Sequence, residues 1–358
     1  MNINELTEGL CALYESAGFK KFKMRKFEEY SLYLENKSFL TSEYVITFND
    51  LSGKLLALKP DVTLSILKNA KALQGGSEKL YYTESVYRLD RRSLEYKEIS
   101  QAGLEIIGEI GLTETAEILL LALRSLSLTG REFTLDISHM GITDSILTAA
   151  VGENLNAKKE IIDALSAKST HDLLRVIKAY GISEEHRKRL LALSSLSRNF
   201  SEGLEELSSL AGEENREYVE ELRGICRVLS ELGYGDSISL DFSIINDSEY
   251  YNGVVFKGYV SGIHRHVLSG GRYDKLSGKF RVGSQAMGFA VYLGDLLSSM
   301  PTPEYDCDIL LLYAGTDDPY AVIKEAEALR SAGAKVRIEK EVPEGLRYRE
   351  IKEAGKNA

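Results

Sequence analysis

Three residues near the end of one segment have the types and spacing of a polar binding surface. Within residues 96–108, Gln101, Gly103 and Glu105 stand at every second position, and in a β-strand residues two apart point to the same face. Leu104 would then face the opposite side. A Gln and a Glu in the middle of a sheet are costly to bury unless they meet a ligand or polar partners. The spacing therefore leaves two interpretations open, a ligand-binding face or a solvent-exposed face of an antiparallel sheet.

Two histidines with one residue between them, His264 and His266, have a spacing that could suit a metal ion. If residues 264–269 form a strand, both imidazoles lie on one face. A tetrahedral zinc site needs three or four protein ligands, and no further ligand is evident in the neighbouring sequence. We therefore predict a surface strand here and no metal site.

The overall composition is that of a globular protein. The 358 residues include 44 Lys and Arg against 54 Asp and Glu, a net charge of −10, which argues against a broad basic face for nucleic acid. The length suggests about two or three domains. The cysteines, Cys11, Cys226 and Cys307, are far apart and in no CxxC pattern, as expected in a reducing cytoplasm. We expect no membrane span and no signal peptide, because long apolar runs are missing and the first residues, MNINELTEGL, lack a basic start.

The elements that must position Gln101 and Glu105 can be predicted from periodicity and turn residues. Residues 3–18 have helical periodicity, and residues 44–48 and 55–58 predict a hairpin. Asp61 is well placed to cap a helix that starts near Thr63. The remaining predicted elements are strands at 79–89, 96–108, 132–137, 237–242 and 251–260, a helix at 113–128, and a strand leading into a helix at 285–299.

Two further regions have their own character. Residues from about 143 to 234 are helical in pattern throughout and predict an all-helical insertion. After Pro301 and Pro303 the pattern of a strand, a helix and a strand predicts one small βαβ unit. The predicted fold class is α+β, with a mostly antiparallel sheet flanked by helices.

Several motifs occur in the chain order of a known family. They are LLALKPDVT at 55–63, VYRLD at 86–90, QAGLEIIG at 101–108, and YYNGVVF with GGRYDKL at 250–256 and 270–276. Together with the helical insertion they resemble the catalytic domain of class II aminoacyl-tRNA synthetases of the histidyl type. The resemblance covers roughly residues 1–300 and implies a class II-type antiparallel sheet. It also implies that residues 305–358 form a partial anticodon-binding-like α/β unit, about half the family's usual size.

The resemblance also implies a pocket for histidine. Its ammonium, carboxylate and imidazole would each need a partner of suitable chemistry. The residues that the resemblance places around the amino group are Asp61, Thr63 and Gln101, and those around the ring are Glu105, Tyr251 and Tyr273. Arg88 would approach a carboxylate or phosphate through its guanidinium fork.

Four positions depart from the synthetase pattern. Asn246 and Asp295 stand where a synthetase carries arginines that serve histidine and ATP, and Glu95 replaces the arginine before Tyr96. Arg25 replaces the first-motif proline. A carboxylate beside a triphosphate is repulsive, so this pattern predicts a protein that keeps the histidine wall without synthetase catalysis.

Such a pattern resembles the regulatory-subunit family of ATP phosphoribosyltransferase, which does not aminoacylate. The resemblance implies a short-form catalytic subunit as partner in the first step of histidine biosynthesis, a homodimeric core, and histidine as a candidate ligand and feedback signal. It implies no cofactor and no tRNA. Two alternatives stay open: a histidine–tRNA ligase rescued by Arg272 or Arg281, and a synthetase-like paralogue with another partner. ATP–pyrophosphate exchange separates the first alternative, and co-purification with a phosphoribosyltransferase separates the second.

Overall fold

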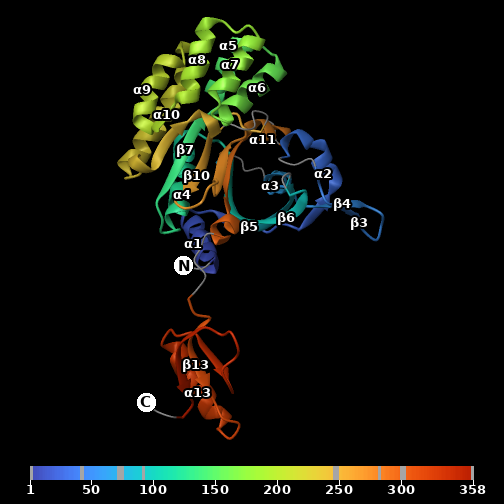
Figure 1. The fold of residues 1–358 in the computed structure, drawn as a ribbon. Helices are drawn as coiled ribbons and strands as arrows, with labels where there is room; N and C mark the ends of the chain where they lie inside the picture. The colour runs from blue at the N-terminus through green and yellow to red at the C-terminus, as the bar shows by residue number, and fades with distance from the viewer. Residues whose placement is uncertain are drawn as a thin grey trace. The chain divides into compact units, whose positions relative to one another are not determined.

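A nine-stranded sheet forms the body of the first of two units into which the chain divides, Met1–Ser299 and Met300–Ala358 (Figure 1). The computed structural model describes residues 3–40, 44–70, 76–90, 93–244, 250–280, 284–298 and 304–355. In spatial order the strands are β1 (Lys20–Lys21), β5 (Ser77–Asp90), β6 (Glu95–Gly108), β12 (Gln285–Tyr292), β11 (Leu268–Arg272), β10 (Val254–Val260), β7 (Phe133–His139), β9 (Ile238–Asp241) and β8 (Ser197–Asn199). Within the described part of this sheet the β1–β5 and β7–β9 pairs are parallel, and the other pairs are antiparallel. This mostly antiparallel sheet with its helices confirms the α+β prediction.

The two faces of the sheet are covered by different helices. Helices α1 (Ile3–Ser16) and α4 (Leu112–Ser127) pack on one face, where the ring of Tyr14 meets that of Phe289 at a centroid distance of 6.0 Å. Leu104 and Ile106 of β6 point to this face and are fully buried. Each such side chain stabilises the fold by about 1.5–3 kcal/mol through apolar burial.

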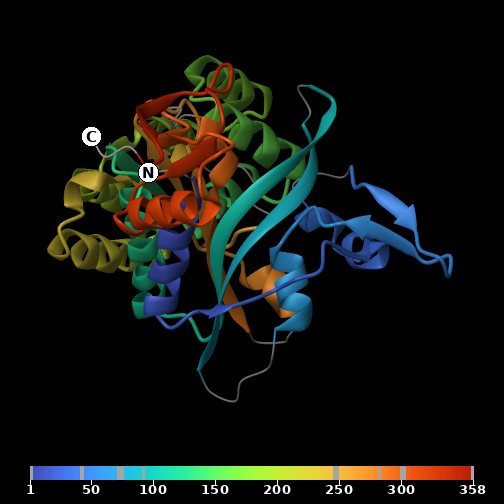
Figure 2. The same ribbon diagram turned by 90° about the horizontal axis from the view of Figure 1, so that it is seen from below.

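The opposite face of the sheet carries the polar residues of β6. Helices α3 (Thr63–Asn69) and α11 (Asp274–Phe280) lie on this side, next to a small antiparallel sheet of β2 (Phe27–Glu29), β4 (Leu55–Leu58) and β3 (Thr47–Asn49). The predicted hairpin is therefore present, with its first strand starting later than expected. Figure 2 shows β5 and β6 as a long twisted pair beside α3 and these three short strands.

The remaining helices of the first unit include the insertion. They are α2 (Tyr30–Glu35), α5 (Met140–Val151), α6 (Leu155–Ser166), α7 (Thr170–Ala179), α8 (Glu184–Ser195), α9 (Phe200–Leu210), α10 (Arg216–Glu231) and α12 (Leu293–Ser298), with 3₁₀ turns at Lys37–Phe39, Glu213–Asn215, Gly235–Ser237 and Phe242–Ile244. Helices α5 to α10 gather over one end of the sheet (Figure 1). The prediction that this region is helical throughout is wrong at β8, which extends the sheet by pairing with β9. A strand of three residues is too short to leave a periodic signal.

His139 joins the insertion to the sheet. It is the last residue of β7, and its Nδ1 accepts a hydrogen bond of 3.1 Å from the backbone N–H of Gly141 at the start of α5. Because Nδ1 accepts, the ring proton belongs on Nε2, which lies 3.1 Å from Glu221 of α10. Tyr218 stacks on the ring at 4.5 Å. One buried imidazole thus holds two insertion helices to a central strand.

The second unit is a three-stranded parallel sheet with one helix. β13 (Cys307–Leu312) lies between β14 (Val336–Glu339) and β15 (Tyr348–Glu353), and α13 (Pro319–Ser331) buries Val322 and Ala326 against it. The predicted βαβ unit is present, and β15 adds a third strand that the sequence pattern did not predict.

Candidate functional site

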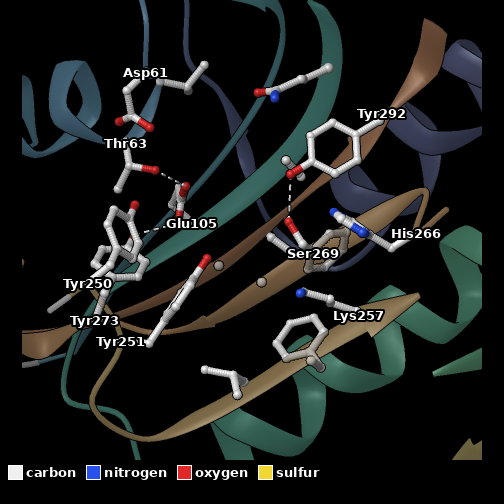
Figure 3. Close-up of a pocket in the computed structure, with 18 of the residues that line it drawn as sticks. Asp61, Thr63, Glu105, Tyr250, Tyr251, Lys257, His266, Ser269, Tyr273 and Tyr292 are labelled. Atoms are coloured by element: carbon white, nitrogen blue, oxygen red, sulfur yellow. Dashed lines mark hydrogen bonds between the residues drawn. The ribbon is translucent and has the colours of Figure 1, made fainter. Parts of the chain in front are cut away.

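A cavity of about 230 Å³ lies on the polar face of the sheet (Figure 3). Its lining includes all seven residues that the resemblance proposed for a ligand: Asp61, Thr63, Arg88, Gln101, Glu105, Tyr251 and Tyr273. Gln101 and Glu105 are each only 3% exposed. The solvent-exposed sheet face, one of the two interpretations left open by the spacing, is therefore wrong.

The register of the sheet explains why a cavity forms here. Glu105 of β6 lies opposite Gly288 of β12, and Gly103 lies opposite Ala290. Cross-strand partners share a face, so small side chains occupy the middle of this face while larger ones surround it. A Cβ on Gly103 would come within 2.6 Å of the Tyr82 hydroxyl. Glycine at this position therefore lets the tyrosine ring close one side of the cavity.

Glu105 accepts hydrogen bonds from two hydroxyl groups in the cavity. The Thr63 hydroxyl donates to its Oε1 at 3.0 Å, and the Tyr273 hydroxyl donates to its Oε2. Burial raises the pKa of Glu105 to about 8; the two hydroxyl bonds oppose this shift and the nearby Asp61 adds to it. Near neutral pH the group is therefore able to donate or to accept a proton when a ligand arrives.

Asp61 lines one end of the cavity and accepts a hydrogen bond from the first turn of α3. Its Oδ1 accepts a hydrogen bond of 2.9 Å from the backbone N–H of Leu64, as expected for a capping residue. Its Oδ2 lies 3.6 Å from the Arg88 guanidinium, whose Nε donates to the Pro60 carbonyl at 2.7 Å. Burial raises the pKa of Asp61, and Arg88 only partly offsets that effect. The pair places a carboxylate that suits an ammonium group beside a cation that is already held in place.

Three tyrosines close the same end. Tyr250 packs against Tyr251 at a centroid distance of 4.6 Å and against Tyr273 at 5.7 Å. Burial raises the pKa of Tyr250 and of Tyr273 well above the usual value of 10. Both hydroxyls therefore stay protonated and can serve as hydrogen-bond donors or acceptors to a flat polar ring.

The other end of the cavity is lined by residues that sequence reasoning missed. Lys257, His266, Ser269 and Tyr292 gather there, and the Ser269 and Tyr292 hydroxyls are 2.7 Å apart (Figure 3). A local signal was available only in part: Lys257 stands two residues after Val255 on β10 and shares its face, but the strand pairing decides which face of the sheet this is.

The prediction of a surface strand at His264 and His266 is wrong. β11 begins only at Leu268, so both histidines lie in the connection that precedes it. His266 turns into the cavity, with its ring 5.6 Å from that of Tyr292. Burial, together with the nearby cations Lys257 and Arg265, lowers the pKa of His266 to about 4. In the part of the chain that the structure describes, no group of three or more His, Cys, Asp or Glu side chains could hold a metal ion.

The departures from the synthetase pattern are only partly visible. Asn246 and Arg281 lie outside the described residues. Asp295, on α12, forms an ion pair of 2.8 Å with Arg265. Arg272 donates to Asp274 at 2.8 Å. Neither Asp295 nor Arg272 belongs to the lining of the cavity.

The arrangement is that of a binding site for a small polar molecule. One end offers carboxyl groups and hydroxyls, and the other offers an ammonium, an imidazole and hydroxyls.

Within the described residues, no helix is both long and apolar enough to span a membrane.

Comparison with known proteins matches this architecture. A family model for histidyl-tRNA synthetase matches residues 1–296. An ATP phosphoribosyltransferase regulatory subunit from Desulfitobacterium hafniense (strain Y51) is 32% identical over 298 residues, which are 81% of this chain and 75% of that protein.

Two solved structures share the fold. One is an ATP phosphoribosyltransferase regulatory subunit/histidyl-tRNA synthetase from Bacillus halodurans, with a TM-score of 0.81 and 23% identity over 98% of this chain and 94% of that chain. The other is a chain of an ATP phosphoribosyltransferase complex from Thermotoga maritima, with a TM-score of 0.64 and 18% identity over 81% of this chain and 97% of that one.

Proposed function

Because the chain belongs to the histidyl-tRNA synthetase-like family of ATP phosphoribosyltransferase regulatory subunits, we propose that it regulates a short-form ATP phosphoribosyltransferase catalytic subunit in the first step of histidine biosynthesis. The observation that supports the proposal is the cavity, which is lined by all seven residues that the resemblance implies for a histidine pocket. In this proposal the protein acts in the cytoplasm, through a hetero-oligomer built on a homodimeric core. It catalyses no reaction itself and needs neither a cofactor nor tRNA.

The proposed ligand of the cavity is histidine. Asp61, Thr63 and Gln101 would surround its amino group, because a buried carboxylate with hydroxyl and amide neighbours satisfies an ammonium. Glu105, Tyr251 and Tyr273 would surround its ring. Arg88 would not contact the ring but would keep the Asp61 carboxylate in place through their ion pair. A ligand bound here can change a partner's activity only if it binds two states of the assembly with different affinity.

The absence of aminoacylation chemistry is also part of the proposal. Asp295 stands where the synthetase pattern has an arginine facing the nucleotide, and its ion pair with Arg265 satisfies it without any ligand. Electrostatic stabilisation by one such donor is worth about 2.7–4 kcal/mol in other enzymes. Because the family model that matches is that of histidyl-tRNA synthetase, the alternative function is that of a histidine–tRNA ligase.

The domain assignment follows the same logic. We propose residues 1–300 as a catalytic-type synthetase domain without synthetase activity, with the insertion at about 143–234, and residues 305–358 as a partial anticodon-binding-like unit.

Co-expression tests the proposal. The short-form catalytic subunit encoded in the same genome should co-purify with this chain and should depend on it for phosphoribosyl transfer to ATP. Histidine-dependent ATP–pyrophosphate exchange by the chain alone would instead support the ligase. A catalytic subunit that is equally active with and without the chain would contradict the regulatory role.

A further inference from the structure

The two ends of the cavity differ in charge type, and this difference follows from the sheet register. Lys257 of β10 lies opposite Ser269 of β11, Ser269 lies opposite Ala290 of β12, and Ala290 lies opposite Gly103 of β6. Ser269, Ala290 and Gly103, the residues across the sheet from Lys257, have small side chains or none and leave the middle of the cavity open. Figure 3 shows Lys257 at the end of the cavity away from Glu105.

The separation between the two ends suits one small molecule. β10 and β6 are separated by β11 and β12, so their backbones are about 14 Å apart at three strand spacings of roughly 4.8 Å. The side chains of Lys257 and Glu105 both stand on the face of the sheet that carries the cavity, whose volume is about 230 Å³. Hydrogen bonds of about 3 Å at each end leave room for a molecule the size of an amino acid.

The residues at the Lys257 end form a set of donors. His266 lies between the rings of Tyr259 and Tyr292, with centroids 6.3 and 5.6 Å away, and its low pKa keeps the imidazole neutral with one N–H. Lys257 lies opposite Asp136 on its other side. Burial lowers the pKa of Lys257, while Asp241 and Asp136 counteract part of that shift.

We propose that Lys257 and His266 bind the carboxylate of an amino acid whose ammonium lies at the Asp61 end of the same cavity. The proposal rests on the proposed function and extends it, because it assigns the one charged group of histidine that the acidic end cannot satisfy. A carboxylate accepts charge-assisted hydrogen bonds from an ammonium and further bonds from an imidazole N–H or a serine hydroxyl. The cavity would then select a zwitterion over an amine of the same shape.

Among the described residues Arg88 also lines the cavity as a cation, and its contacts assign it to the opposite end. Its Nε is bonded to the Pro60 carbonyl, and its terminal nitrogen faces Asp61 at 3.6 Å. Lys257, at the end away from Asp61, is the cation among the described lining residues that is placed to meet a carboxylate.

The test compares histidine with histidinol, in which a hydroxymethyl group replaces the carboxylate. Isothermal titration of the full chain should show histidine binding more tightly than histidinol, on the order of tenfold or more, the usual worth of a charge-assisted hydrogen bond. Lys257→Met should abolish this preference by weakening histidine alone, and Lys257→Arg should keep much of it. The matched control, Lys178→Met, removes an exposed lysine of α7 and should change neither affinity.

Each other outcome has a distinct meaning. If Lys257→Met is folded and keeps the preference for histidine, the carboxylate lies elsewhere and this inference is overturned, while the proposed function stands. If inorganic phosphate tightens histidinol binding to the wild type, the end serves a separate anion, which also overturns it. If the wild type binds neither compound, histidine is not the ligand, and the proposed role of the cavity fails together with this inference.

Discussion

Gly288 lies directly opposite Glu105 in the paired strands β12 and β6, so closely that a Cβ on Gly288 would be 1.8 Å from Oε2 of Glu105. The same Cβ would be 2.3 Å from the carbonyl oxygen of Leu104. The carboxyl group thus occupies the space that a side chain on β12 would take. The cavity exists because one strand provides a carboxylate and its neighbour provides no side chain.

Replacing Gly288 by alanine should therefore disrupt the cavity. The added methyl group must displace Glu105 from Thr63 and Tyr273, and the backbone clash cannot be relieved by a rotamer change. Overpacking of this kind costs about 1–3 kcal/mol. We expect a lower midpoint in urea unfolding and loss of histidine binding.

Gly278→Ala is the matched control for this variant. Gly278 lies in α11, and a Cβ there would meet no heavy atom within 4 Å. Alanine is a better helix former than glycine by about 1 kcal/mol, so this variant should be unchanged or slightly more stable. Equal stability and equal binding in Gly288→Ala and Gly278→Ala would contradict the close packing described here.

The raised pKa of Glu105 predicts how stability depends on pH. Between its ordinary value of 4.5 and its folded value of about 8, the folded state holds a proton that the unfolded state has lost. The free energy of unfolding should therefore fall as pH rises through this window and level off above about pH 8. Each pKa unit corresponds to about 1.4 kcal/mol, so the total effect is on the order of a few kcal/mol.

Glu105→Gln should remove that slope. Its free energy of unfolding, measured against pH 5 to 9, should change less than that of the wild type, and it should be the more stable of the two above about pH 8. Glu98→Gln, an exposed position on the same strand, should keep the wild-type slope. Parallel curves for the wild type and Glu105→Gln would mean that the carboxyl group ionises normally in the fold.

The sequence predicted one wall of the site because a single strand carries a strict period of two. Gln101 and Glu105 needed only that period to be placed on one face. The opposite wall is formed by residues of β10, β11 and β12. Which of their residues line the cavity depends on the register in which these strands pair. The facing of Lys257 and Ser269, for example, is set by a pairing that no local pattern encodes.

The errors have local causes. His266 alternates with His264 as strand residues would, but the chain makes a turn before β11, and alternation over three residues cannot exclude that. β8 was missed because three residues within a helical region give no pattern of their own. The long elements β5, β6 and α4 were predicted well, since their periodicity extends over many residues.

The synthetase rival makes a separate prediction. The purified chain should show no histidine-dependent ATP–pyrophosphate exchange, and the double change of Asn246→Arg with Asp295→Arg should not restore it. The Asp295 change would also bring two arginines together, because Arg265 is now the partner of Asp295 at 2.8 Å. Exchange at a synthetase-like rate, in the wild type or in the double variant, would contradict the proposal that the chain has no synthetase activity.

A matched pair of variants tests whether the cavity is the feedback site. Glu105→Ala removes the proposed imidazole partner from a residue that is 3% exposed, so assembly with the catalytic subunit should persist in gel filtration. Inhibition of the assembled complex by histidine should weaken roughly tenfold, because the imidazole loses its buried hydrogen-bond partner. Glu98→Ala should leave inhibition unchanged. Undiminished inhibition in a fully assembled Glu105→Ala complex would move the sensor to the partner.

The most direct measurement is reconstitution of the phosphoribosyltransferase reaction. The purified short-form catalytic subunit from the same genome is titrated with this chain, and phosphoribosyl transfer to ATP is followed with and without histidine. We expect activity to rise with added chain to a plateau at a fixed subunit ratio, and histidine to lower that plateau. A catalytic subunit whose activity and elution volume are the same at every concentration of the chain would contradict the account.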